Sequence, residues 1–181
     1  MAAFASPYIK TEGSTVARSA DAPVMTGANF SRWFNAGEGS FVVDANSVAG
    51  GAFRSTLRAT DSAANNYVEL GMVTGTNNGQ GRYQLNYAGA SQVDTGNISS
   101  PAFVVNTFYK NAASYKVNDF AISRDGAAVV ADTSGSVPLG LDRLELGGRH
   151  ITNASLLSGY IKSISYYPAR LTNAQLQAIT G

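Results

Sequence analysis

The carboxylates of this chain are the residues with the clearest catalytic potential. Hydrolysis of a glycosidic bond needs two carboxyl groups, about 5 Å or about 6.5–9.5 Å apart. The glutamates of this 181-residue chain stand far apart in the sequence, at Glu12, Glu38, Glu69 and Glu145. The nearest carboxylate neighbours, Asp142 and Glu145, would point to opposite faces of a strand, because side chains alternate along it. The spacing therefore argues against a glycosidase, and a pair built from distant residues is kept as an alternative.

Histidine and cysteine offer little further chemistry in this sequence. His150 is the only histidine, and it is a candidate general base because imidazole changes charge near neutral pH. A histidine that lies in a surface loop or caps a backbone group is the favoured alternative. The chain has no cysteine, which excludes thiolate nucleophiles, disulfides and zinc sites that depend on sulfur. No glycine-rich phosphate loop and no calcium-binding D-x-[DN]-x-[DN]-G run occurs. We therefore expect no cofactor, with calcium held by Asp, Asn and backbone oxygens as the alternative.

Aromatic and planar polar side chains are plentiful, and these residue types hold sugars. Aromatic rings pack on the C–H faces of sugar rings, and amides or guanidinium groups match pairs of hydroxyls. We expect Trp33 to pack under the first strand, and Tyr83 and Tyr87 to belong to a packed strand face. A flat apolar patch for subunit contact would use the same residue types. The sugar-binding candidates near polar, turn-like sequence are Tyr109, Tyr115, Arg149 and His150.

Alternation of apolar and polar residues predicts the strands that must position these side chains. Val42 interrupts the alternation of Phe41 and Val43, so the faces of that strand are not clear from the sequence. The clearest alternating segments are Arg82–Tyr87, Tyr67–Met72 and Arg143–Leu146, and weaker ones are Phe53–Ala59 and Phe103–Tyr109.

Turn residues separate the predicted strands. Asp125-Gly126 lies between two strand-like runs and supplies the positive φ angles of a type I′ turn, which predicts a hairpin within Val117–Ala131. Other breaks are rich in Gly, Ser and Asn, and no helical pattern separates the strands. Strands at this spacing predict an all-β protein, an antiparallel β-sandwich.

One short helix is predicted at the end of the chain. Thr172 and Gln175 fit a capping box, in which each side chain satisfies a backbone N–H of the first turn. Pro168 ends the preceding strand. Within that strand Ile161 and Ile164 are three residues apart, so they fall on opposite faces unless a bulge intervenes. A bulge and burial on both faces are both open.

Composition limits the partners of the chain. Only 14% of residues are charged, the net charge is +1, and the 13 Lys and Arg are scattered singly. Nucleic acids and anionic membranes are therefore not expected as partners. The first residues show no signal peptide. Alternation is weak over residues 1–22, which we interpret as a lead-in or junction segment before one domain over residues 23–181.

Four stretches carry a resemblance to a known family. Leu157–Gln177 resembles the closing signature of concanavalin A-like, laminin-G-like jelly-roll domains, in which G-x-I-x-x-I-x-Y-Y leads into L-T/S-x-x-Q/E-L. The likeness is closest to domains of bacteriophage tail fibres and other virion appendages. Ser6–Asp21, Phe30–Val43 and Asn118–Gly126 also look like that group. The resemblance implies a jelly roll, a junction near the start of the chain, and a longer natural polypeptide.

The resemblance and the missing carboxylate pair together favour a non-enzymatic module that binds a carbohydrate or receptor. It would belong to a phage virion, on a tail fibre or head appendage, and would be made in the host cytoplasm. Its expected partners are host cell-surface polysaccharide and other virion subunits, with a homo-oligomer through a longer parent chain. A structural assembly or capsid-decoration domain is the second hypothesis, and polysaccharide cleavage is the third.

Overall fold

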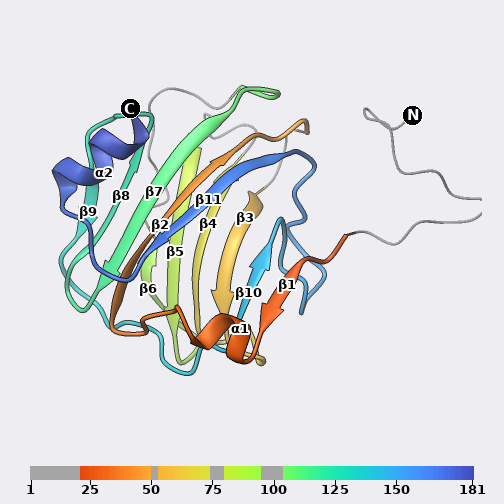
Figure 1. The fold of residues 1–181 in the computed structure, drawn as a ribbon, viewed down its shortest axis with the longest axis vertical. Helices are drawn as coiled ribbons and strands as arrows, with labels where there is room; N and C mark the ends of the chain where they lie inside the picture. The colour runs from red at the N-terminus through yellow and green to blue at the C-terminus, as the bar shows by residue number, and fades with distance from the viewer. Residues whose placement is uncertain (1–20, 50–52, 74–79, 95–103) are drawn as a thin grey trace, which may run out of the picture.

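The structure is a computed structural model that describes residues 21–49, 53–73, 80–94 and 104–181. Within these ranges the chain is mostly β, in two antiparallel sheets with a short C-terminal helix, which confirms the predicted fold class (Figure 1). The lead-in over residues 1–22 falls almost wholly outside the described residues, so the division at residue 22 stays a prediction. No helix of the described ranges is long and apolar enough to cross a membrane.

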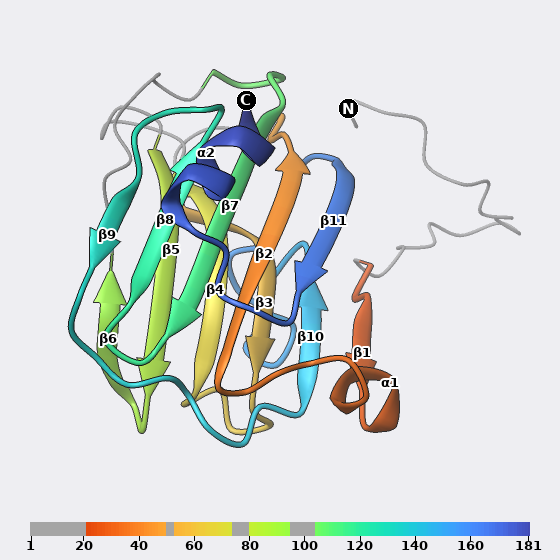
Figure 2. The same ribbon diagram turned by 60° about the vertical axis from the view of Figure 1, so that its left-hand side comes forward.

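The strands form two layers, which Figure 2 shows from a second direction. Six strands make one sheet, in the order β1 (Val24–Thr26), β10 (Arg143–Leu146), β3 (Phe53–Thr60), β4 (Tyr67–Val73), β5 (Gln80–Tyr87) and β6 (Ala90–Asp94). Five make the other, in the order β11 (Ile161–Tyr167), β2 (Glu38–Ala45), β7 (Tyr109–Lys116), β8 (Phe120–Arg124) and β9 (Val130–Asp132). The helix α2 (Asn173–Thr180) lies against β7 and β8, on the outer side of the five-stranded sheet.

The core lies between the two sheets and takes one face of each central strand. Its members include Phe41, Val43, Leu57, Val68, Leu70, Met72, Tyr83, Leu85, Phe120, Ile122 and Leu144. The alternation predicted for β4, β5 and β10 is thus confirmed. Val42 is buried on the opposite face of β2, in a second cluster with Leu176 of α2. Both faces of β2 are covered, which explains why Val42 breaks the alternation.

The turn at Asp125-Gly126 has the predicted geometry. Asp125 and Gly126 have φ angles of 46° and 72°, and the N–H of Ala127 donates to the carbonyl of Arg124 over 2.8 Å. The two strands that flank this turn, β8 and β9, pair antiparallel. The hairpin is therefore confirmed.

The end of the chain also follows its predicted signals. The register of β11 against β2 shifts between Ile161 and Ser163, so the structure shows the bulge, and Ile161 and Ile164 both pack on the core. Both hydrogen bonds of the capping box at Thr172 are present. The short helix α1 (Ala28–Ser31) precedes Trp33. The ring centroids of Trp33 and Phe30 are 5.1 Å apart and Trp33 packs against the core, as expected of a packing residue.

The strand predicted over Phe103–Tyr109 is wrong for its described part. Residue 103 lies outside the described residues, and β7 begins only at Tyr109. Before it the chain makes a turn, in which the N–H of Thr107 donates to the carbonyl of Val104 over 3.2 Å and Asn106 has a φ of 65°. A positive φ interrupts a strand, so the apolar residues of this segment do not form one.

Candidate functional site

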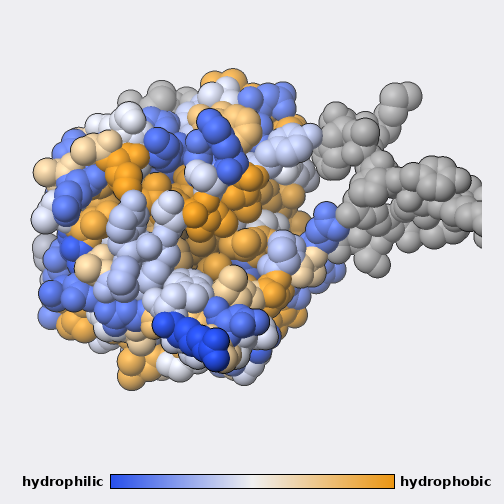
Figure 3. All heavy atoms as spheres, viewed as in Figure 1, coloured by the Kyte–Doolittle hydropathy of each residue, from blue (hydrophilic) through white to orange (hydrophobic). Residues whose placement is uncertain are grey.

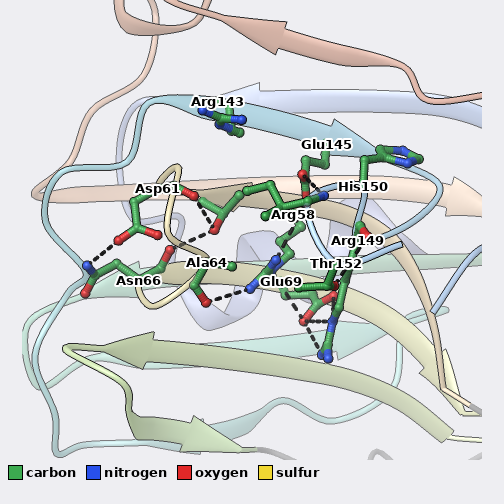
Figure 4. Close-up of polar contacts among 12 residues, drawn as sticks. Arg58, Asp61, Ala64, Asn66, Glu69, Arg143, Glu145, Arg149, His150 and Thr152 are labelled. Carbon is green, nitrogen blue, oxygen red and sulfur yellow. Dashed lines mark hydrogen bonds and ion pairs between the residues drawn. The ribbon is translucent and has the colours of Figure 1, made fainter. Parts of the chain in front are cut away.

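Charged side chains gather on the outer face of the six-stranded sheet. Leu57, Leu70 and Leu144 face the core, so the next residue along each strand faces outward, because side chains alternate. Two of those outward residues are Arg58 and Glu145, and the register places Glu69 of β4 opposite Arg58. All three are nevertheless buried, since the segment after β10 crosses over them (Figure 4). An outer sheet face with buried charges is the most unusual feature of the described structure.

Arg149 is the centre of this face. Its Nε lies 2.8 Å from Oε1 of Glu69, its Nη2 lies 2.6 Å from Oε2 of Glu69, and Nη2 also lies 3.1 Å from Oε1 of Gln84. This is a bidentate ion pair, which fixes the plane of the guanidinium group. The hydrogen bond to Glu69 raises the pKa of Arg149, despite its partial burial. Arg149 is 26% exposed, whereas Glu69 is fully buried.

Arg58 stands between the two buried glutamates. Its Nε lies 4.0 Å from Oε2 of Glu69, and its Nη1 lies 3.7 Å from Oε2 of Glu145. Within the described residues neither nitrogen donates a hydrogen bond, and Oε2 of Glu145 accepts none. The other oxygen of Glu145 accepts from the N–H of Ile151 over 3.0 Å, which ties the crossing segment to the sheet.

Two aromatic rings lie among these cations. The guanidinium carbon of Arg58 is 4.3 Å from the ring centroid of Tyr67, and that of Arg149 is 5.1 Å from the centroid of Phe53. Arg82 approaches the same Phe53 ring, at 5.5 Å. Burial is the main cause that raises the pKa of Tyr67, and Glu69 adds to it. Cations and rings therefore alternate along this face.

Gly71 makes room for the Phe53 ring. A Cβ atom at Gly71 would collide with that ring and would lie 2.5 Å from the backbone oxygen of Arg54. Only a residue without a side chain lets Phe53 lie this close to the sheet. The sequence cue at this position was the glycine inside the alternating segment of β4.

The four residues predicted from the sequence do not come together. Arg149 and His150 leave the same segment, but Figure 4 shows Arg149 directed toward Glu69 and His150 directed away from it. Nε2 of His150 lies 2.7 Å from the carbonyl oxygen of Leu146. Of the four, only Arg149 pairs with the charged residues on the outer face of the six-stranded sheet.

Tyr109 and Tyr115 lie inside the sandwich. Tyr115 is 1% exposed, and its hydroxyl donates to the carbonyl of Asn35 over 2.6 Å and lies 3.0 Å from the hydroxyl of Tyr166. Burial raises its pKa strongly. Tyr109 is 4% exposed, below the guanidinium group of Arg124. Both rings were chosen because polar sequence follows them, but their strand faces inward.

The face also contains residues that the sequence reasoning did not select. Arg58, Glu69 and Tyr67 stand in strands that were predicted, at positions that alternate with the core residues. Phe53 has the same sequence parity as the core residue Leu57, and the register shift between Ser55 and Leu57 places it on the outer face. The sequence signal for Arg58 and Glu69 was a charged residue on the outer face of a central strand. The sequence did not show that residues 147–156 would cover this face, with Arg149 bonded to Glu69 and the N–H of Ile151 bonded to Glu145.

Other features of the described surface are less organised. A shallow depression of about 410 Å³ beside α2 is lined by Glu38, Lys116, Asp119, Arg170, Thr172 and Asn173. Its charges are already paired, Arg170 with Asp119 at 2.7 Å and Lys116 with Glu38 at 3.6 Å. On the same side, Figure 3 shows apolar residues across the middle of the molecule. Across residues 21–49, 53–73, 80–94 and 104–181, no group of three His, Asp or Glu is placed to hold a metal ion.

Comparisons with known proteins agree on the fold. No protein-family model and no curated protein sequence matches the chain. Among solved structures, the CBM40 domain of the Ruminococcus gnavus IT-sialidase bound to α2,3-sialyllactose is 18% identical, with a TM-score of 0.65 over 81% of this chain and 84% of that one. The Streptococcus pneumoniae NanB sialidase is 13% identical, with a TM-score of 0.70 over 86% of this chain and 26% of that one.

A third similar structure is the mouse laminin α1 chain, domains LG4-5, which is 13% identical, with a TM-score of 0.56 over 83% of this chain and 40% of that one. These likenesses show the fold and not the activity. The chain is thus a jelly-roll sandwich of the concanavalin A-like type, as its sequence resemblance implied.

Proposed function

We propose that this chain is a non-catalytic carbohydrate-binding module, and that the outer face of its six-stranded sheet is the sugar site. The observation that carries the proposal is the fixed guanidinium group of Arg149, held by Glu69 and Gln84 beside the rings of Phe53 and Tyr67. Planar polar groups that match hydroxyl pairs and rings that pack on C–H faces are what a sugar needs.

Two further points support a binding role. Both oxygens of Glu69 already accept hydrogen bonds from Arg149, so this carboxylate is engaged in holding the face together. The CBM40 domain of similar fold was solved bound to α2,3-sialyllactose. That domain is a precedent for sugar binding on this architecture, and we extend sugar binding to the present chain as a proposal.

Titration of the purified chain with oligosaccharides chosen from a glycan array tests this proposal. Arg149→Ala is expected to weaken binding about 10- to 100-fold, the equivalent of one or two hydrogen bonds to a charged group. Arg32→Ala, at the exposed end of α1, is the matched control and should leave the affinity unchanged. EDTA should also leave it unchanged, since we propose no metal cofactor. Absence of binding to every glycan at millimolar concentration would refute the proposed function.

We also propose, from the sequence resemblance alone, that the module is displayed on a phage tail fibre or head appendage. Its ligand there would be host surface polysaccharide, and its neighbours would be other virion subunits. An excess of the purified chain is expected to slow phage adsorption to host cells, and the Arg149→Ala chain is expected not to. If particles from infected cells contain no peptide of this sequence by mass spectrometry, the virion location is wrong.

A further inference from the structure

We infer that this chain has a second, weaker sugar-binding surface on the outer face of the five-stranded sheet. The second surface consists of Phe108, Tyr160, Lys162 and Asp44. With a sugar surface on each sheet, one chain would hold two strands of polysaccharide together. The inference rests on the proposed function, because it assigns the same class of ligand to another face of the molecule. Its residues lie across the core from Arg149, so the two surfaces can be tested apart.

The ends of three neighbouring strands bring the two aromatic residues of this surface together. The last residue of β2 is opposite the first residue of β11 and the first residue of β7, and Figure 2 shows these three ends at the top of the sheet. Phe108 and Tyr160 come immediately before β7 and β11, so they flank Asn46, the residue after β2. At the usual spacing of about 4.8 Å between neighbouring strands, the backbones of Phe108 and Tyr160 lie about 10 Å apart.

The side chains of this surface point away from the core. Asp44 alternates with the buried core residues on either side of it in β2, so it faces outward. Nζ of Lys162 lies 3.6 Å from Oδ2 of Asp44 and 5.9 Å from the centroid of the Phe108 ring. These contacts place Lys162 and Phe108 on the same outer side. Phe108 is 43% exposed and Tyr160 is 48% exposed, so two large rings are open to solvent beside an ion pair.

Tyr160 is carried on a fixed backbone. Its N–H donates to Oδ1 of Asn46 over 2.8 Å, and the N–H of Asn46 donates to the carbonyl of Tyr160 over 2.9 Å. A Cβ atom at Gly159 would collide with the carbonyl oxygen of Asn46, so the glycine permits this close approach. A segment that is ordered before binding loses less conformational entropy when it binds. The exposed ring of Tyr160 is therefore held ready for contact.

Lys162 and Asp44 supply the polar groups that a sugar also needs. The ammonium group has three N–H donors, and the carboxylate is an acceptor. Their separation of 3.6 Å is longer than a hydrogen bond, and Lys162 is 69% exposed, so the ammonium group can turn toward a hydroxyl group of a ligand. The pair is neutral as a whole. The second surface therefore selects hydroxyl groups and the C–H faces of sugar rings rather than a charge.

The second surface is expected to be the weaker one. Arg149 is fixed in plane by Glu69, whereas Lys162 is a point charge on a flexible stem and loses more freedom on binding. We expect the second surface to bind a free oligosaccharide at least about tenfold more weakly, below what calorimetric titration resolves. A polymer that carries the sugar many times would engage both surfaces. Linking two weak contacts in this way raises the avidity about 100- to 10,000-fold.

Nuclear magnetic resonance of the isotope-labelled full chain tests the second surface directly. The probe is the oligosaccharide that binds most tightly on a glycan array. The backbone amide signal of Arg149 should shift first, and those of Phe108 and Tyr160 at concentrations at least about tenfold higher. Phe108→Ala and Tyr160→Ala should each reduce the second set of shifts and leave the first unchanged. Leu139→Ala, which removes another exposed apolar side chain, is the matched control and should change neither.

The same oligosaccharide, coupled in many copies to linear polyacrylamide, tests whether one chain joins two strands. The native chain should cross-link this polymer and raise its light scattering. Tyr160→Ala and Arg149→Ala should each abolish the cross-linking, and Leu139→Ala should preserve it. The mass of the native chain without sugar is measured first by light scattering. If it is a dimer that Tyr160→Ala dissociates, the second surface joins two copies of the chain and the inference is wrong.

The outcomes separate this inference from the proposed function. If only the signals around Arg149 shift, or if Tyr160→Ala cross-links the polymer as well as the native chain does, the inference is wrong and the proposed function stands. If only the signals of Phe108 and Tyr160 shift, the sugar site lies on the five-stranded sheet, and both the assignment to Arg149 and the pair of surfaces are wrong. If no sugar binds, both proposals fail. Because Phe108→Ala and Tyr160→Ala are made separately, loss of folding in one variant leaves the other to decide.

Discussion

Replacing Glu69 by alanine is expected to lower the free energy of unfolding by about 3–5 kcal/mol and to abolish sugar binding. Glu69 is fully buried and accepts hydrogen bonds from Arg149, while Arg58 stands 4.0 Å away. Among the described residues, its removal leaves Glu145 as the carboxylate that pairs with the buried guanidinium group of Arg58 and leaves Arg149 without its bidentate partner. Urea unfolding followed by tryptophan fluorescence measures the stability, and calorimetric titration measures the binding.

Two further variants sharpen this prediction. Glu69→Gln keeps the shape and removes the charge, so it should unfold at a urea concentration between those of the native chain and Glu69→Ala. Glu38→Ala removes a partly exposed carboxylate that pairs with Lys116, and it should cost less than about 1 kcal/mol. If Glu69→Ala were no less stable than Glu38→Ala, the buried charges would not hold the crossing segment to the sheet as argued.

The fold was predictable wherever one face of a strand is buried and the other is solvated. The alternation that includes Tyr83 and Leu85 predicted β5 in this way, and the Asp125-Gly126 pair predicted the hairpin after β8. Prediction failed where another element covers the second face, as α2 does over Val42. It also failed in the turn before β7, because apolar residues there are exposed rather than paired.

The site was less predictable than the fold, for a physical reason. Arg149 was selected as a candidate because it lies near turn-like sequence, but its partner Glu69 is 80 residues earlier in the chain. Charged residues on an outer strand face are ordinarily solvated, and single-sequence reasoning gives them no special meaning. Only the path of residues 147–156 over the sheet turns Arg58, Glu69 and Glu145 into one buried cluster. That path depends on tertiary contacts, which no local pattern encodes.

Tyr115 gives the second large effect, and it separates packing from binding. Tyr115→Ala is expected to lower the free energy of unfolding by about 3–5 kcal/mol, because a fully packed ring is removed. The ring of Tyr115 lies 6.0 Å from that of Phe34 and 6.3 Å from that of Phe41. Tyr115→Phe keeps the ring and loses the hydrogen bond to the carbonyl of Asn35, so we expect a cost of about 1–2 kcal/mol.

Binding measurements distinguish a packing role of Tyr115 from a role in binding sugar. Its ring lies inside the sandwich, whereas the proposed sugar face lies on the outer side of the six-stranded sheet, so a packing role leaves the affinity alone. Tyr115→Phe should therefore bind the same glycans as the native chain, measured at a temperature where both are fully folded. Tyr67→Phe, on the sugar face, is the matched variant for comparison. A tenfold loss of affinity in Tyr115→Phe with Tyr67→Phe unaffected would place the sugar at the Tyr115 end of the sandwich and overturn the assignment made from Arg149.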